Sequence, residues 1–369
     1  MFELLWLSLL PHMGLTKKHE LLKTHSSAKN VFDTLSSSLD PDKSCQKKAE
    51  SVMFECEKKG IFILPFNKIC TCSDFSLPLL VYCKGNMPSA APSVGIVGTR
   101  RCTPYGKKIT AEIAEKYALS RHTVVSGMAK GIDSYAHTVT IKAKGFTIAV
   151  LGNGPDICFP AEHARLMEEI VRTGLIVSEY PPGTKASVYT FPMRNRIIAA
   201  LSDFLIVTES GIKGGAMITA EKAAKYNVPV FAVPGNITSP ESSGCNFLIS
   251  SGRAKMFTCD MLKNETHANP GKNQLSLSDI DPEFDKTNPN HKVKKFAGCS
   301  GSEDSATNRI SENRFRDKIL NILKLHNNTI SFSELTELLA LPLPELYDVL
   351  LPLELDDTIQ IQGEKIWLP

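Results

Sequence analysis

The feature that most constrains this chain is a short apolar run that ends in a glycine turn with two arginines. Residues 93–101 read SVGIVGTRR, so a buried strand leads into a turn formed by Gly98, Thr99, Arg100 and Arg101. A turn of this kind opens a helix, where backbone amides and cationic side chains receive phosphate. The segment therefore predicts an α/β domain with an anion site at the end of this strand.

A second cationic segment predicts a matching helix start. Residues 191–199 read FPMRNRIIA, with Arg194 and Arg196 on either side of Asn195 and aliphatic residues behind them. Two arginine-bearing helix starts in one α/β domain indicate an anion site. The anion is either a single nucleotide or a nucleic-acid backbone, and these residues alone leave both open.

Seven apolar segments with strand character recur between residues 93 and 263, and most are followed by Gly or Ser and a helical pattern. Such alternation is typical of βαβ units, so we predict a Rossmann-like parallel sheet core over residues 93–263. Ligands of such sheets bind beyond the carboxyl ends of the strands. The predicted strands are Val94–Val97, Thr123–Ser126, Thr147–Leu151, Leu175–Ser178, Phe204–Val207, Val230–Val233 and Lys255–Phe257.

A glycine-bearing turn after the second of these strands, SGMAKGID at residues 126–133, adds to the predicted site. Gly131 allows close approach of the backbone, and Asp133 is expected to cap its helix. His137 is expected to be a hydrogen-bonding packing residue, because no nucleophile stands near it in the sequence. The residues of this turn assigned to binding are Ser126, Gly127, Lys130 and Gly131.

Two further glycine turns are weaker signals. Residues 152–154, GNG, lack the third glycine of a dinucleotide-binding fingerprint. Residues 211–219, GIKGGAMIT, are not a P-loop, because Gly-Lys-Ser/Thr is absent. The amides of Gly214 and Gly215 are expected to contact a phosphate or a sugar.

The segments on either side of the core have distinct compositions. We predict a small helical domain (helix-hairpin-helix or SAM-like, or another small bundle) over residues 1–60 and a proline-interrupted extended lead-in over 61–92. Residues 264–312, rich in Asn, Ser, Gly, Asp and Pro, are expected to be a flexible linker. Residues 313–369 show the order of three helices and a hairpin, which predicts a winged-helix domain, with Ser331 and Glu334 as a capping box.

Charge and cysteine usage narrow the function classes. The net charge is +3, but residues 93–263 carry +7, which favours an anionic partner for that domain. Ten cysteines without a CxxC pair indicate free thiols in a reducing cytoplasm and no zinc site. No apolar run reaches the ~20 residues of a membrane span, and the start lacks the basic region of a signal peptide. The pattern offers no nucleophile–base pair, paired carboxylates or metal-ligand set, so we expect no enzyme activity, no cofactor and no metal.

A series of motifs resembles the DNA-processing protein A (DprA, also called Smf) family. In order, they are VGTRRCTPYG, SGMAKGIDSYAH, TIAVLGNG, FP at residues 159–160, SEYPPGT, FPMRNRIIAALS, ITAEKAA, VFAVPGNI and GCNFLI. They cover nearly all of residues 93–257, and ordered motifs at compatible spacings are a specific signal.

This resemblance implies a cytoplasmic, homodimeric protein that binds single-stranded DNA. It implies a recombination mediator that protects incoming DNA and helps load the RecA recombinase during natural transformation, with no membrane partner. It further implies that Arg100, Arg194, Asn195 and Arg196 bind DNA. Where the family often has Ser-Gly-Ser, this chain has Gly-Gly-Ala at residues 214–216, which removes two hydroxyl donors.

Other function classes stay open beside this resemblance. Aromatic residues near the basic turns offer stacking faces for bases, and each fits a packing role equally well; they are Tyr105, Tyr180, Tyr189 and Phe191. The rival is a nucleotide-phosphate hydrolase of the lysine-decarboxylase-like Rossmann type. Such enzymes carry a PGGxGT turn and a downstream catalytic glutamate, whereas IKGGAMIT and Glu221 lack that pattern here. A third class is a structural adaptor that works through the acidic C-terminal unit.

The charge of the C-terminal unit generates a first prediction. Winged helices usually meet DNA with a basic helix and wing, but residues 333–369 carry eight acids and one base. Glu345 and Asp348 lie on the candidate recognition helix, so the unit should repel phosphate and bind protein instead. Deleting residues 313–369 should leave the affinity for single-stranded DNA unchanged, or raise it at low salt, in a gel-shift titration. An isolated unit that binds DNA as tightly as residues 93–263 would contradict this.

Overall fold

The computed structural model describes residues 1–187, 189–263, 318–326, 328–339, 358–362 and 365–368, together with residues 346, 350 and 353. The described residues of 1–10 and 19–281 form one compact unit, and those of 11–18 and 282–369 form another. The predicted linker over 264–312 lies outside the described residues. No helix in the described part of the chain has the length and apolar character needed to cross a membrane.

The chain begins with four helices, as the sequence predicts for residues 1–60. Trp6 is fully buried, and its indole nitrogen donates to Asp40 Oδ2 at 3.0 Å. The Asp40 carboxylate also accepts the backbone N–H groups of Cys45 and Gln46 at 3.0 Å, so it caps the last of these helices and ties it to the first. The helices are α1 (Phe2–Leu9), α2 (Leu15–His25), α3 (Ala28–Leu39) and α4 (Ser44–Lys58).

A nine-stranded sheet follows, and all seven predicted strands are present in it. Its order is β1-β2-β6-β5-β4-β3-β7-β8-β9, and the seven strands from β3 to β9 are parallel to one another. The parallel strands are β3 (Ser93–Gly98), β4 (Thr123–Ser126), β5 (Thr147–Leu151), β6 (Leu175–Ser178), β7 (Phe204–Glu209), β8 (Val230–Ala232) and β9 (Lys255–Met256). Because the chain runs outward from β3 to β6 and then returns to β7, the strand order reverses between β3 and β7, where ligand sites of such sheets form.

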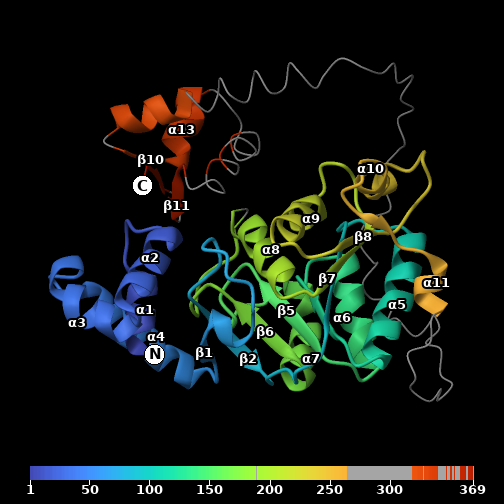
Figure 1. Cartoon of the computed structure of the whole chain (residues 1–369), viewed down its shortest axis with the longest axis horizontal. Coiled ribbons are helices and arrows are strands. Elements are labelled where there is room, and N and C mark those ends of the chain that lie inside the picture. The colour runs from blue at the N-terminus through green and yellow to red at the C-terminus, as the bar shows by residue number, and fades with distance from the viewer. Residues whose placement is uncertain are drawn as a thin grey trace. The chain divides into compact units, whose positions relative to one another are not determined.

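Helices cover both faces of this sheet (Figure 1). Apolar side chains alternate along the strands, so that Ile96 packs toward α5 and α6 while Val97 packs toward α8 and α9. Buried parallel strands are continuous apolar runs for this reason. The remaining helices of this unit are α5 (Pro104–Leu119), α6 (Ile132–Lys142), η2 (Ala161–His163), α7 (Ala164–Thr173), α8 (Thr190–Ala200), α9 (Gly215–Lys225), η3 (Pro240–Ser242), α10 (Ser243–Ser250) and α11 (Cys259–Lys263).

The lead-in predicted over residues 61–92 contributes two strands to this same sheet. β1 (Phe62–Pro65) pairs antiparallel with β2 (Leu80–Gly85), and β2 pairs antiparallel with β6. The 3-10 turn η1 (Phe66–Lys68) separates them. The segment is extended, as predicted, but its prolines did not signal that it adds to the edge of the sheet.

The C-terminal unit has a small sheet of its own. Its strands are β10 (Thr329–Ser331), β11 (Gln360–Gln362) and β12 (Lys365–Trp367), in the order β10-β12-β11, with α13 (Phe332–Leu339) after β10. The predicted capping box is confirmed: the amide of Glu334 donates to Ser331 Oγ, and the amide of Ser331 donates to the Glu334 carboxylate. Glu345 and Asp348 of the candidate recognition helix lie outside the described residues.

Candidate nucleic-acid interface

A cation and two aromatic rings lie side by side at the carboxyl edge of the sheet. Arg100, in the turn after β3, is exposed, and its guanidinium lies over the Phe191 ring at 5.2 Å from the centroid. Phe191, in the first turn of α8, packs against Phe159 with ring centroids 5.2 Å apart, and Phe159 is 44% exposed. This Arg100 surface (Arg100, Phe191 and Phe159) presents both a positive charge and apolar ring faces to solvent. Phe159 was not among the predicted site residues.

The turn that carries Arg100 lies directly on the start of α6. The amide of Ile132 donates to the Thr99 carbonyl at 3.2 Å, and a Cβ on Gly131 would lie 2.4 Å from that same oxygen. Gly131 also has φ +78°, which favours glycine. This predicted binding glycine therefore has a packing role, because only glycine lets α6 approach the Arg100 turn this closely.

Arg194 is buried beneath the surface and is 4% exposed. Its Nη1 donates to the main-chain oxygens of Gly127 and Val150, at the ends of β4 and β5. A Cβ on Gly127 would overlap this guanidinium, so the glycine makes room for the arginine. The sequence predicts that Arg194 binds DNA; in this structure its hydrogen bonds are to the protein, and a DNA contact stays a prediction.

Asp133 lies near enough to Arg194 and Arg100 for their charges to act on it. It is 5% exposed, and burial raises its pKa, while the charges of Arg194 and Arg100 act in the opposite direction. Its carboxylate accepts the amide of Ala129 at 3.4 Å. Ser126, another predicted site residue, donates its hydroxyl to the Ile96 carbonyl at 2.6 Å.

Arg196 lies away from the Arg100 surface, in contact with Glu179. Its guanidinium is 1% exposed and pairs with both oxygens of Glu179 at 2.7 Å, at the end of β6. Arg100, Arg194 and Arg196 therefore do not form one exposed groove: Arg100 is exposed, and the other two are buried in contacts with the protein. Asn195 does connect two predicted elements, because its amide nitrogen donates to the Gly215 carbonyl at 3.2 Å. The amide of Gly214 donates to the Gly211 carbonyl.

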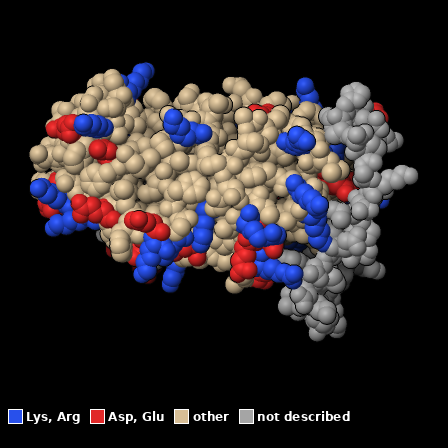
Figure 2. All heavy atoms as spheres, turned by 90° about the horizontal axis from the view of Figure 1, so that it is seen from below, with Lys and Arg blue, Asp and Glu red and all other residues tan. Residues whose placement is uncertain are grey.

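Other predicted cations lie near the edge. Arg101 follows Arg100 and is exposed. Lys130, at the turn before α6, is exposed and pairs with Glu162. Figure 2 shows one face of the molecule on which Lys and Arg are interspersed with Asp and Glu and form no broad basic field. That face therefore offers no broad electrostatic attraction for an anion.

The start of α5 differs from the expectation that its amides receive phosphate. Glu209, at the end of β7, is 2% exposed, and its carboxylate accepts the amide of Thr103 at 2.8 Å and the Thr103 hydroxyl at 2.6 Å. Thr103 Oγ in turn accepts the amide of Gly106 at 3.1 Å. The Glu209 carboxylate thus occupies the start of α5, where a phosphate would otherwise bind to the backbone amides. An anion is therefore attracted by the exposed side chains of the preceding turn, such as Arg100.

His137 has the packing role that the sequence predicts. It is fully buried; its Nε2 accepts the amide of Met128 at 3.2 Å, and its Nδ1 lies 2.7 Å from the Thr147 hydroxyl. The Thr147 hydroxyl donates to the Val124 carbonyl, so His137 Nδ1 carries the proton and donates to Thr147. Burial lowers the pKa of His137 to about 3. The described residues contain no group of three or more His, Cys, Asp or Glu side chains suited to hold a metal.

The sequence of this chain is similar to those of known proteins. A family model described as DNA recombination-mediator protein A matches residues 70–265. Protein Smf of Synechocystis sp. is 46% identical over 161 residues, which are 44% of this chain and 40% of that protein. DNA processing protein DprA of Bacillus subtilis is 37% identical over 195 residues, which are 52% of this chain and 66% of that protein. The chain thus spans less than two thirds of the length of these relatives.

A solved structure is similar as well. The DNA processing protein A of Helicobacter pylori, whose structure concerns its single-stranded DNA binding mode, is 32% identical with a TM-score of 0.50. The likeness covers 55% of this chain and 94% of that one.

The buried His137 generates a prediction for stability against pH. Its folded pKa lies below the unfolded value of 6.5, so below about pH 6.5 the unfolded chain binds the extra proton. The free energy of unfolding should therefore fall as pH drops from about 6.5 toward 3, with a contribution of about 1.4 kcal/mol per pH unit from this group. Urea titrations at several pH values give the free energy of unfolding of the wild type and of His137→Gln, which keeps a donor and an acceptor. Plotted against pH, this free energy should fall more steeply with acidification in the wild type than in the variant. An equal pH dependence of the free energy of unfolding in the two proteins would contradict a neutral, buried His137.

Proposed function

We propose a function from one premise, that this chain belongs to the DNA recombination-mediator protein A family. The proposed function is binding of single-stranded DNA at the carboxyl edge of the sheet, as a recombination mediator. The observation that carries it is the Arg100 surface, where an exposed guanidinium lies over the Phe191 ring and Phe159 adjoins it. Proteins that bind single strands without sequence preference combine cations for phosphates with aromatic faces for bases.

The residues divide into those that touch the strand and those that support them. We assign phosphate contacts to Arg100, Arg101 and Lys130, which are exposed. Bases stack on Phe191 and Phe159, whose rings need no sequence-specific partner. The other predicted site residues keep their assignment to the interface. Gly98 lies against Ile132 and the Glu209 carbonyl, where a Cβ would not fit. The rest give the edge its shape through the contacts described above; they are Thr99, Ser126, Gly127, Gly131, Arg194, Asn195, Arg196, Gly214 and Gly215.

The wider role is part of the same proposal. Support comes from family membership and from the H. pylori relative, whose structure concerns single-stranded DNA binding. We propose that the chain works in the cytoplasm as a homodimer, protects incoming strands and helps load the RecA recombinase, without catalysing a reaction. A gel-shift with single-stranded, duplex and mononucleotide competitors tests the substrate class: single strands should compete best.

Arg100→Ala tests the phosphate contact. Loss of a charge-assisted contact should weaken binding by about tenfold, similarly across DNA sequences. The slope of log affinity against log salt should become shallower by about 0.7, the share of one phosphate on a single strand. Arg100→Lys should restore only part of the affinity, because a guanidinium grips phosphate with two parallel hydrogen bonds. Fluorescence anisotropy at several salt concentrations gives both quantities.

Two variants sharpen this experiment. Phe191→Ala should weaken binding with no change in the salt slope, because a stacking face carries no charge. Arg172→Ala is the matched control: its side chain is 69% exposed and lies at the end of α7, where the chain enters β6 at the opposite edge of the sheet. Equal losses in Arg100→Ala and Arg172→Ala would overturn the site.

The absence of turnover is a separate prediction. The purified chain should hydrolyse neither nucleotides nor DNA above background in a phosphate-release and gel assay. Glu221, the residue that a hydrolase of this fold class would need, is exposed on α9. Activity that co-purifies through several columns and disappears in Glu221→Ala would overturn this and favour the hydrolase.

A further inference from the structure

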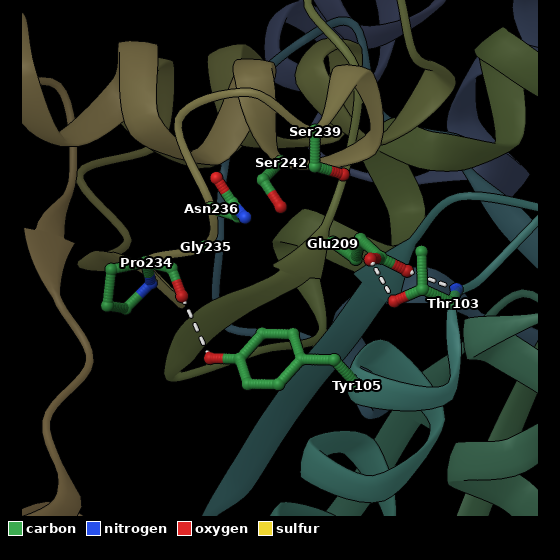
Figure 3. A pocket seen from close by; sticks show the side chains of 8 residues that line it. All are labelled: Thr103, Tyr105, Glu209, Pro234, Gly235, Asn236, Ser239 and Ser242. Atoms are coloured by element: carbon green, nitrogen blue, oxygen red, sulfur yellow. Dashed lines mark hydrogen bonds between the residues drawn. The ribbon is translucent and has the colours of Figure 1, made fainter.

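A pocket of about 380 Å³ lies beside Glu209, between the start of α5 and the loop that follows β8 (Figure 3). Its volume falls in the range of small-molecule sites, about 300–1,000 Å³. Thr103, which caps α5, and Tyr105 of α5 form one side, and Pro234, Asn236 and Ser242 form the other. Among these residues, only Tyr105 was named in the sequence analysis, as one of the aromatic residues that offer a stacking face for a base.

The walls of this pocket, which we call the Tyr105 pocket, are held by contacts within the protein. The Tyr105 hydroxyl donates to the Pro234 carbonyl at 2.8 Å and joins α5 to the loop after β8. Glu209 is bound by Thr103 through both carboxylate oxygens, and each oxygen keeps a further lone pair. The pocket is therefore built before a ligand arrives, with the Tyr105 ring as a flat face that is 45% exposed.

One hydroxyl that lines this pocket has no partner among the described residues. Ser242 is 5% exposed and lines the pocket, and Figure 3 shows its side chain, with that of Asn236, directed toward the space between Tyr105 and Glu209. Asn236 Oδ1 accepts hydrogen bonds from the amide and the hydroxyl of Thr238. The side-chain nitrogen of Asn236 is therefore the group that can donate to a ligand. The Ser242 hydroxyl is therefore free to form a hydrogen bond with a ligand in the pocket.

The lining decides the class of ligand. Glu209 is the one charged side chain among the lining residues that the structure describes, so a phosphate would meet a negative charge and no cation. A flat group with amino or ring N–H donors suits the free lone pairs of Glu209, and its acceptors suit Ser242 and Asn236. Stacking on an aromatic face together with hydrogen bonds to base edges is how proteins recognise unstacked bases.

We propose that the Tyr105 pocket binds one nucleobase that carries an exocyclic amino group. The base lies on the Tyr105 ring, gives its amino hydrogens to Glu209, and accepts from Ser242. One source is a base of the strand bound at the Arg100 surface, which rests on the proposed function; the turn over residues 99–103 joins the two places. The other source is a free nucleoside, which does not depend on DNA binding.

Equilibrium dialysis with adenosine, cytidine, guanosine and thymidine tests the pocket without any phosphate. The three amino-bearing nucleosides should bind more tightly than thymidine. Tyr105→Ala should lower their affinity by about tenfold, within the range that loss of one base–aromatic stack gives. Ser242→Ala, which removes a hydroxyl without a partner and leaves the fold intact, should lower it severalfold. Phe54→Ala, which removes an exposed ring on α4, is the control and should change nothing.

A second experiment distinguishes a base of a bound strand from a free nucleoside, and tests the Tyr105 pocket separately from DNA binding at the Arg100 surface. With dA and dT oligonucleotides of equal length, Tyr105→Ala should reduce the preference for dA and leave the salt slope unchanged if the base comes from a strand. If the wild type binds nucleosides in the pocket but Tyr105→Ala does not change oligonucleotide binding, the ligand is a free nucleoside, and the pocket assignment is supported. Arg100→Ala should weaken oligonucleotides but not nucleosides, so failure of the DNA proposal leaves this test standing. Equal binding of thymidine, or equal losses in Tyr105→Ala and Phe54→Ala, would overturn the pocket assignment.

Discussion

The carboxyl edge of the sheet depends on the buried guanidinium of Arg194. Main-chain oxygens at the ends of β4 and β5 accept hydrogen bonds from it, and Asp133 lies near enough for its charge to act on it. Removing the guanidinium would leave two buried carbonyl groups without these donors and would remove from the Asp133 carboxylate one of the two positive charges that act on it. The same contact explains why residue 127 is glycine. Arg100 is carried by a turn that rests on this framework through Gly131.

Glu209 divides the edge into two chemically different places. On one side, its main-chain oxygen accepts the amide of Thr99 at 2.7 Å and fixes the start of the turn that presents Arg100. On the other, its carboxylate caps α5 through Thr103 and forms the acidic wall of the Tyr105 pocket. One residue at the point where the strand order reverses thus separates a cationic, aromatic surface suited to phosphates and bases from a pocket suited to uncharged donors.

Local patterns were sufficient to predict the strands of the parallel sheet and the capping box of α13. The strands of the parallel sheet were predicted because strands buried on both faces are unbroken apolar runs, and Thr123–Ser126 and Thr147–Leu151 are found with the predicted bounds. The Ser331–Glu334 capping box was predicted because it is a contact between residues three apart. β1 and β2 were not predicted as part of the sheet, because their pairing partners lie far along the chain.

The sequence by itself determined the α/β class, the order of strands and helices, and the family, because these depend on short periods and on motifs within single turns. Tertiary structure decided which cations face solvent. Arg100, Arg194 and Arg196 are alike in the sequence, but the packing of α8 against the sheet buries the last two against main-chain oxygens and Glu179. It also decided that Tyr105 meets Pro234, because only the fold brings together side chains that are 129 residues apart.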